Sequence, residues 1–481
     1  MARNVAQAPI WHEHGVGRLK TRLAAALALL AVASAVPLAS NRPSWWLLWT
    51  AVLGLLGAVH QIATFRVVTN GPARLRPFAV YFLLAALVPV WAILQAQPFA
   101  GLLPQGLLAV PSGMAALAGR AISAVPDASQ LGALRFVGYL ILLALVIDVS
   151  SRRERVGLIS RLLFLGIFLQ AVWALVALKL LGDIAPFSEK TAYLGMATGT
   201  FVNRNSLATF LGFGLILGVS LIGRRFEGPE IRTSRPRGAF EKLGAEGRLV
   251  LVAMLIILLA LLATQSRLGT AASMTGLAVT SLVLLGYHGR LSVGLGLGIV
   301  LGGVILIGGA VVFTGAGLSD RALFSEADST TRFDLYHQIL GMIALRPWTG
   351  FGFDGFGPAF EAFRAPPLNG AETFDLAHDS YLMLWSELGL VVGSLPPLLL
   401  AAAGVLLVRR LRRGDGFAAN AAGAIGVLVL GALHSLGDFS LEMPANNYVL
   451  LVILGMGLAL RNQSPNSQAA QPGPPSRTKP A

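Results

Sequence analysis

Long apolar runs separated by short polar segments fill most of this sequence. A helix needs roughly 20 mostly apolar residues to cross the hydrocarbon layer of a membrane, where its backbone groups must bond to one another. Runs that reach or approach this length lie at 23–39, 45–62, 78–97, 134–149, 157–181, 205–222, 249–264, 268–287, 291–313, 381–408, 417–435 and 447–460. Only 12% of the residues are charged, about half the share in soluble domains. The sequence therefore predicts an all-α polytopic membrane protein with about 12 transmembrane helices.

Clusters of Lys and Arg predict the orientation of these helices. They recur in alternate loops, such as SRRERVG at 151–157 and RRLRRGDG at 409–416, and in the N-terminal segment. Because basic residues are retained on the cytoplasmic side of short loops, we expect these segments inside and the loop at 314–378 outside. The net charge of +14 then reflects topology and contacts with anionic membrane lipids, and no nucleic-acid partner is expected.

Composition divides the chain into four parts. We expect a cytoplasmic N-terminus at 1–22, transmembrane helices at 23–194 and at 195–460, and a disordered, Pro-rich cytoplasmic tail at 461–481. The segment 98–133 is weakly amphipathic and contains several prolines, so we expect it to lie along the external membrane interface. The AVASA sequence in the first run is compatible with a cleaved signal peptide, but its leading segment is long for one, and we expect a retained span.

The external loop contains an amphipathic segment, STTRFDLYHQILGMIALRPWTG, at 329–350. We expect a helix with Ser329 as its N-cap and Arg332 in its first turn, which ends at Arg346-Pro347. The apolar face is predicted from residues spaced three or four apart: Phe333, Tyr336, Ile339, Leu340 and Ile343.

The motif GFGFDGFG at 350–357 follows this predicted helix. Its Gly350, Gly352 and Gly355 formally match the G-x-G-x-x-G of dinucleotide sites. No predicted strand precedes the motif and no helix-opening pattern follows it. We therefore expect a tight turn of glycines and aromatic residues.

The stretch AHDSYLMLWSELGL places His378 where the external loop enters the run at 381–408. The N-terminus of the expected helix presents free N–H groups and a partial positive charge, which attract phosphate. The same charge disfavours imidazolium, so the ring stays neutral and can accept a proton near pH 7. At 100° per residue Tyr381 and Trp385 share the face of His378, whereas Glu387 lies opposite and is not expected to be its partner. A histidine that merely occupies the interface is the alternative.

Four arginines lie toward the same predicted side of the membrane: Arg204, Arg267, Arg332 and Arg346. Arginine side chains bind phosphate through two parallel hydrogen bonds, so several of them together would suit a diphosphate. Taken singly, each could instead anchor a helix end at the interface. The chain has no Cys, which excludes disulfides and thiol nucleophiles, and no external D-x-D motif indicates a metal.

His434 and Asp438 in LHSLGDFSLEMP are four residues apart near the external end of a predicted span. On a helix both would lie on one face. We expect them to support the site or to bind the acceptor. The alternative is a local pair that stabilises the helix end.

Five motifs in order resemble the O-antigen ligase and polymerase superfamily of bacterial envelope glycosyltransferases. They are GTFVNRNSLATFLG, TQSRLGT, TRFDLYHQILGMIALRPWTGFGFDGFG, AHDSYLMLWSELGL and LHSLGDFSLEMP, and the resemblance covers about residues 195–445. It implies a GT-C-like helical bundle in the inner membrane of bacteria, with a periplasmic site that takes glycans from undecaprenyl diphosphate. It also implies that His378 is the loop histidine of the family and that Arg267 and Arg332 are its arginines.

The sequence departs from the family pattern at three places. Asp379 stands where Asn is usual, Arg204 stands where Pro is often found, and the Gly389 to Gly393 spacing is one residue longer than usual. The first departure puts the acceptor or the pKa of the histidine in doubt, and the second makes Arg204 less transferable.

The resemblance implies a metal-independent, inverting glycosyltransferase that needs no cofactor. His378 would deprotonate an acceptor hydroxyl, while Arg267 and Arg332 neutralise the departing diphosphate. The acceptor stays open among a lipid A-core (ligase), another lipid-linked glycan (polymerase) and a protein (O-oligosaccharyltransferase). A transporter or flippase of lipid-linked sugars, or a noncatalytic scaffold, is the alternative outside this enzyme class.

Overall fold

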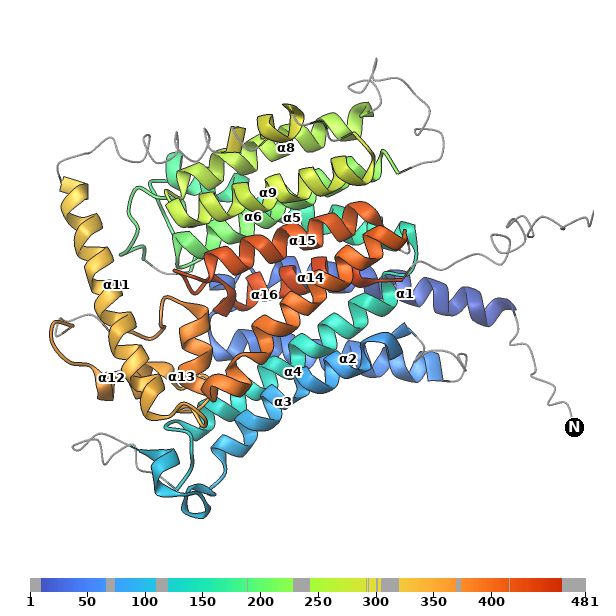
Figure 1. The fold of residues 1–481 in the computed structure, drawn as a ribbon. Coiled ribbons are helices and arrows are strands. Elements are labelled where there is room, and N and C mark those ends of the chain that lie inside the picture. The colour runs from blue at the N-terminus through green and yellow to red at the C-terminus, as the bar shows by residue number, and fades with distance from the viewer. Residues whose placement is uncertain are drawn as a thin grey trace, which may run out of the picture.

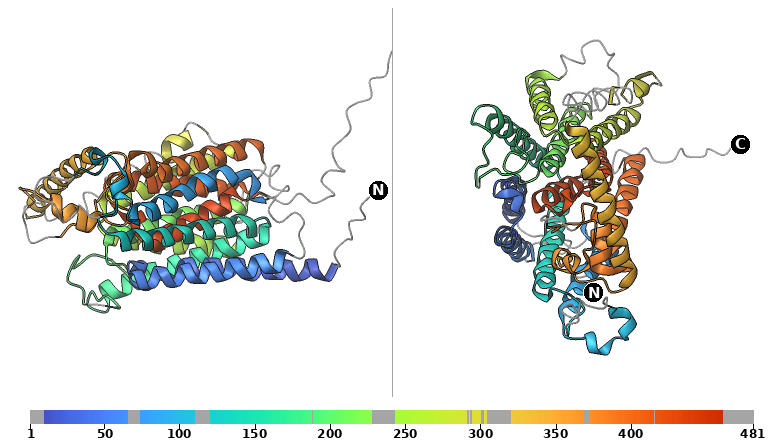
Figure 2. Two further views of the ribbon diagram at one scale, coloured as in Figure 1. Left: turned by 90° about the horizontal axis from the view of Figure 1, so that it is seen from below. Right: turned by 90° about the vertical axis from the view of Figure 1, so that its left-hand side faces the viewer.

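A computed structural model describes residues 10–65, 74–109, 120–187, 189–227, 243–290, 292, 294–299, 302–303, 320–368, 373–414 and 416–460. Every regular element in these ranges is a helix. Figure 1 and Figure 2 show the long helices running side by side as a bundle, with α11, α12 and α13 gathered at one end. The all-helical prediction is confirmed for this part of the chain.

The bundle contains helices from both halves of the sequence. They are α1 (Ile10–Ala33), α2 (Pro43–Phe65), α3 (Ala79–Ala96), α4 (Pro126–Val149), α5 (Arg153–Lys179), α6 (Arg204–Arg224), α8 (Gly244–Ala263), α9 (Arg267–Tyr287), α14 (Leu395–Arg413), α15 (Ala418–His434) and α16 (Pro444–Leu458). The end elements are α11 (Asp320–Leu345), α12 (Phe356–Phe363) and α13 (Ser380–Gly393).

Seven helices of the described part are long and apolar enough to cross a membrane, and the number rises to 8 if α13 and α14 count as one bent span. Shorter apolar helices, α15 and α16, cover two further predicted runs. The predicted run at 291–313 falls mostly outside the described residues. The chain is thus a polytopic membrane protein, while the count of about 12 spans and the GT-C architecture stay predictions.

The run at 381–408 is broken, although we expected one span. Helices α13 and α14 meet at an angle of 68°. Gly389, inside α13, has φ +77° and interrupts that helix before its end at Gly393, and prolines in the first turn of α14 suit the start of a new helix. The carbonyl oxygens freed by the break at Gly389 are bonded elsewhere, since Ser386 accepts from the N–H of Phe351 at 2.9 Å and Glu387 from that of Gly352 at 3.0 Å. The glycine turn therefore packs directly on the break.

The GFGFDGFG segment is the tight turn predicted from sequence. Gly350 and Gly352 have φ values of +64° and +109°. A Cβ at Gly350 would lie 2.2 Å from the carbonyl oxygen of Glu387, so only glycine allows this approach. One detail of the prediction was wrong, because a helix does follow the turn: α12 begins at Phe356.

Helix α11 begins earlier than predicted. It starts at Asp320, so Ser329 is not its N-cap and Arg332 lies in its middle, although its end at Leu345 agrees with the predicted stop. Its buried face is formed by Leu335, Ile339, Met342 and Ile343, which pack on Phe351, Phe356 and Phe360. Phe333 and Leu340, predicted to lie on this face, are instead 72% and 51% exposed.

The predicted interfacial segment 98–133 is shorter than expected. Residues 126–133 form the first turns of α4 rather than an interfacial stretch, because Pro126 suits the first turn of a helix. Before them the chain makes short 3-10 turns at Ala100–Leu102 and Gln105–Leu108. The N–H of Ala124 donates to the carbonyl oxygen of Phe351 at 2.8 Å. This segment therefore packs against the glycine turn.

Candidate functional site

The chain between α15 and α16 forms a tight turn, residues 434–440, at the end of the bundle that carries α11. Asp438 is fully buried and accepts hydrogen bonds from Asn205 Nδ2 at 2.7 Å and from Ser440 Oγ. His434 is also buried, and its Nδ1 lies 2.5 Å from Thr209 Oγ1. Both side chains thus bind α6, and the 434–440 turn is fixed to that helix.

The predicted common helical face of His434 and Asp438 is wrong. Helix α15 ends at His434, so Asp438 lies in the turn beyond it. The spacing of four residues carries no information about a shared face once the helix has ended. Asn205 and Thr209, which bind these side chains, are new members of the site. Both belong to the GTFVNRNSLATFLG motif, which is the signal that could have identified them.

His378 lies at the entrance to α13, as the sequence predicts. Its φ of +54° is left-handed, and the next residue, Asp379, caps the helix by accepting from the N–H groups of Tyr381 and Leu382 at 2.8 and 2.9 Å. Asn and Asp serve equally well as N-caps, so the departure at Asp379 preserves this structural role. Burial raises the pKa of the Asp379 carboxyl, against the effect of the two N–H groups.

Three contacts hold His378 and the start of α13 between the 434–440 turn and α11. Its ring meets Phe439 edge to face, with 4.8 Å between ring centroids. Its carbonyl oxygen accepts from the hydroxyl of Tyr336 on α11 at 2.9 Å. The N–H of Ser380 donates to the carbonyl oxygen of Ser435 at 3.0 Å. The half-buried imidazole is therefore held between α11, α13 and the turn.

Arg332 and Arg267 lie on α11 and α9, and both helices contact the 434–440 turn. Arg332 Nη1 donates to the carbonyl oxygen of Gly437 at 2.9 Å. Arg267 is the first residue of α9, behind the N-cap Ser266, and its side chain is exposed. A Cβ added at Gly269 would lie 3.3 Å from His434 Cε1, so the first turn of α9 touches the 434–440 turn.

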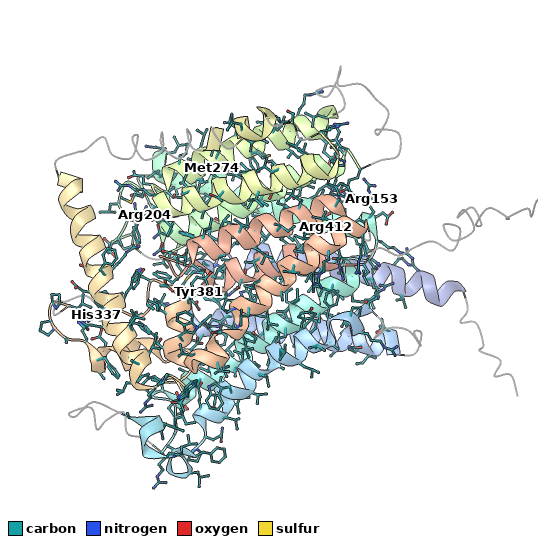
Figure 3. The ribbon with its side chains drawn as sticks, viewed as in Figure 1. Arg153, Arg204, Met274, His337, Tyr381 and Arg412 are labelled. Atoms are coloured by element: carbon teal, nitrogen blue, oxygen red, sulfur yellow. The ribbon has the colours of Figure 1, made fainter. Side chains whose placement is uncertain are left out.

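Arg204 is the first residue of α6 and lies beside the start of α9. Its guanidinium donates to the carbonyl oxygen of Gln265 at 3.2 Å and lies 5.7 Å from the ring of Tyr193. Asn203 caps the helix and donates to the hydroxyl of Tyr193 at 3.1 Å. Figure 3 shows Arg204 and Tyr381 at the same end of the bundle, at its α11 side.

Arg346 and Trp385 lie away from the 434–440 turn. Arg346 is 3% exposed, and its guanidinium donates to the carbonyl oxygens of Ala109, Ile122 and Leu108 at 3.0, 3.0 and 3.2 Å. Burial lowers the pKa of Arg346 to about 10. Trp385 Nε1 donates to Ser394 Oγ at 3.0 Å, across the break in the span. These two side chains hold backbone segments together.

Sequence reasoning missed a buried ion pair next to the glycine turn. Arg135 on α4 donates to Asp354 at 2.5 Å, and Gln95 on α3 donates to the carbonyl oxygens of Thr349 and Glu387 at 2.7 and 2.8 Å. Ionisable residues inside membrane helices are rare and paired, so Arg135 could have been singled out by its position within a span. Its partner Asp354 could not have been identified from the sequence, because the two residues are more than two hundred positions apart.

Among the described residues, no group of three His, Asp or Glu side chains could hold a metal ion. The expectation of a metal-independent reaction stays a prediction.

A comparison with known protein families agrees with the motifs in the sequence. Residues 252–396 match the family model described as O-antigen ligase. This segment is similar to O-antigen ligases. It runs from α8 to the first turn of α14 and includes Arg267, Arg332 and His378, and the resemblance to the O-antigen ligase and polymerase superfamily is thereby confirmed. No curated protein matches the chain. A segment similar to O-antigen ligases indicates an enzyme that transfers glycosyl groups.

Proposed function

We propose that this protein transfers a glycan from an undecaprenyl-diphosphate donor to an acceptor hydroxyl at the periplasmic face of the bacterial inner membrane. One observation carries the proposal above the others: His378 and Arg332 both contact the 434–440 turn, through Phe439 and Gly437. An imidazole and a guanidinium thus contact the same turn at one end of a membrane bundle. That arrangement suits a proton acceptor beside a diphosphate leaving group.

The proposed reaction is a direct displacement at the anomeric carbon of the donor sugar. The acceptor hydroxyl gives its proton to the imidazole of His378 as its oxygen attacks, and a new glycosidic bond forms. The bond between the anomeric carbon and the diphosphate oxygen breaks, and its electron pair leaves with the diphosphate. Arg332 and Arg267 neutralise that growing charge, which stabilises the transition state more than the bound substrate.

The remaining side chains position these groups. Asp438 and His434 hold the 434–440 turn on α6, and Arg204 ties the start of α6 to the residue before the Ser266 cap. We assign Arg346 a structural role instead of donor binding. Its guanidinium already donates to three carbonyl oxygens, and these bonds join the end of α11 to the segment before α4. Trp385 has a similar structural role at the break between α13 and α14.

The test is transfer by purified protein in detergent, with an undecaprenyl-diphosphate glycan as donor and lipid A-core or a second lipid-linked glycan as acceptor. Product with either acceptor supports the proposal, and no product with any lipid or protein acceptor contradicts it. Mass analysis of envelope glycans after deletion of the gene then separates the two activities. Uncapped core with accumulated polymer indicates a ligase, whereas single repeats indicate a polymerase.

The periplasmic position of the site has its own test. Topology reporters fused after Arg237 and after Asp354 should report opposite compartments. Arg237 lies in a basic loop, which is expected inside, and Asp354 lies in the loop at 314–378, which is expected outside. The same compartment for both fusions would contradict the orientation.

A further inference from the structure

A buried aspartate with three basic neighbours lies at the end of α4. Asp148 belongs to the last turn of that helix. Lys20 Nζ of α1 lies 2.6 Å from its carboxylate, His60 Nε2 of α2 lies 3.0 Å away, and Arg74 Nη1 lies 3.5 Å away. Lys20 and His60 are buried as well. One carboxylate therefore joins three helices and the segment that precedes α3.

This cluster lies at the membrane surface on the side away from the candidate site. Helix α4 ends at Val149 and α5 begins at Arg153, and both helices are long and apolar enough to cross a membrane. Residues between two such helices lie at the depth of the lipid head groups. Figure 3 shows Arg153 at the end of the bundle opposite to His337 and Tyr381. The cluster also lies outside the matched segment 252–396.

Arg155, in the first turn of α5, is a buried guanidinium without a counterion among the described residues. The residue is 4% exposed. Its Nη2 donates to Ser151 Oγ at 2.9 Å, and the same hydroxyl oxygen accepts from Arg74 Nη1 at 2.8 Å. In the described part of the chain its Nε has no hydrogen-bond partner, and no carboxylate forms an ion pair with it. A buried arginine is almost always paired, because an uncompensated charge is costly to bury.

Positive charge exceeds negative charge around Arg155. Its neighbours Arg74 and Arg152 repel it, whereas the attracting groups are the carboxylates of Asp148 and of the exposed Glu154. Three guanidinium groups thus share two carboxylates, and the buried carboxylate is already paired with a lysine and a histidine. This excess of buried positive charge calls for an anion.

Ser150 Oγ is a further polar atom without a partner in this part of the structure. Ser150 is fully buried in the turn between α4 and α5, and its hydroxyl makes no hydrogen bond within the described residues. The cluster is open to solvent on one side, because the side chain of Arg74 is 30% exposed and Arg152 is exposed. A phosphate that enters from that side would accept hydrogen bonds from the guanidinium groups and supply the missing negative charge.

We propose that this cluster binds the phosphate of an anionic phospholipid, with Arg155, Arg74 and Arg152 as its ligands. Guanidinium groups bind phosphate through two parallel hydrogen bonds, and the position at the helix ends favours a phosphate carried by a lipid over free phosphate. Exposed basic loops attract anionic lipids diffusely, whereas a buried guanidinium without a counterion defines one site. The inference is independent of the reaction proposed at the other end of the bundle.

The experiment measures lipid binding to the purified full chain in a nonionic detergent by native mass spectrometry. Phosphatidylglycerol, which is anionic, is compared with phosphatidylcholine, which carries no net charge. We expect one phosphatidylglycerol to bind wild type at least about tenfold more tightly than phosphatidylcholine, since each basic residue contributes roughly fivefold. Arg155→Gln should lose this preference. Arg152→Gln changes an exposed side chain, so it should fold normally and weaken phosphatidylglycerol binding by about fivefold.

The matched control is Arg248→Gln, which removes the same charge from an exposed position near the start of α8 and should bind phosphatidylglycerol like wild type. Equal losses in Arg152→Gln and Arg248→Gln would show diffuse attraction and overturn the proposal, even if Arg155→Gln does not fold. Equal binding of the two lipids by wild type would also overturn it. Melting temperatures separate the sources of phosphate. A rise with phosphatidylglycerol supports the lipid site, whereas a rise with inorganic phosphate alone would contradict it.

Discussion

The guanidinium of Arg332 donates a hydrogen bond to the carbonyl oxygen of Gly437, 2.9 Å away, although 105 residues separate the two in sequence. This bond joins α11 to the turn that follows α15. The same turn carries Phe439, on which the ring of His378 packs. A single rigid turn therefore sets the relative position of the proposed base and of the proposed diphosphate ligand, which is what displacement with little reorganisation requires.

The imidazole of His378 should be needed for turnover and not for donor binding. We expect His378→Ala to lower the transfer rate by about 10²–10⁴-fold, because general-base help is lost, while the dissociation constant of the donor changes little. Single-turnover transfer and donor binding by purified protein measure the two effects. His337→Ala is the matched control, since His337 is exposed on α11 and should be dispensable. Wild-type transfer by folded His378→Ala protein would show that His378 is not the base.

The two arginines should behave differently from the histidine. Arg332→Ala should weaken both donor binding and turnover, because a guanidinium contacts the diphosphate before and during its departure. Arg267→Lys keeps the positive charge but loses the fork that binds two phosphate oxygens, so a loss of at least about tenfold in kcat/KM indicates direct contact. Arg267 is exposed, and its replacement should leave the melting temperature unchanged. Normal donor binding in both variants would contradict the assignment.

Local signals in the sequence were enough to locate the entrance of α13. The polar AHDS sequence before an apolar run indicates a helix start, and Asp379 does cap the helix behind His378. Runs of apolar residues likewise predicted the bundle helices. Such signals depend on neighbours along the chain, so a single sequence displays them.

Features fixed by distant contacts were not predictable in this way. The break at Gly389 depends on the glycine turn, which supplies N–H donors to the freed carbonyl oxygens of α13. Arg346 and Arg332 are both arginines of the predicted loop helix, and the sequence does not distinguish them. In the structure Arg346 donates to three backbone carbonyl oxygens of an external segment, whereas Arg332 donates to the 434–440 turn. Only the fold distinguishes these roles.

Arg346 should matter for stability. Arg346→Ala would leave three backbone carbonyl oxygens without their donor, at a cost of roughly 1–3 kcal/mol for an unsatisfied buried group. We expect a lower melting temperature and weaker protection of residues 107–109 and 120–122 in hydrogen exchange. Donor affinity of the protein that stays folded should be unchanged. A variant with wild-type stability and lost donor binding would restore Arg346 to the donor site.

Glu442 lies in the short segment between α15 and α16 and predicts a pH dependence. Burial raises the pKa of this carboxyl to about 7, while Arg135 acts in the opposite direction and Asp354 in the same one. Because the folded pKa is above the unfolded value, its contribution to stability is present below about pH 4.5 and is lost as the pH rises through about 7.

Glu442→Gln tests this expectation, since it removes the titration and keeps the shape of the side chain. The variant should unfold at a higher temperature than wild type at pH 8, and the difference should be small at pH 5. Its melting temperature should also depend less on pH. An identical pH profile for the two proteins would show that Glu442 does not titrate in this range.

Replacing glycine by Ala should have opposite effects on stability at two positions of the external region, Gly350 and Gly341. At Gly350 the φ of +64° disfavours Ala, and the new Cβ would lie 2.2 Å from the carbonyl oxygen of Glu387, so Gly350→Ala should destabilise the protein by more than about 2 kcal/mol. Gly341 lies inside α11 with no atom within 4 Å of an added Cβ. Gly341→Ala should stabilise by about 0.5–1 kcal/mol, because Ala loses less backbone entropy in a helix. Melting temperatures in one detergent compare the two variants directly. Similar shifts for both would mean that the glycine turn does not pack on the break at Gly389 in α13.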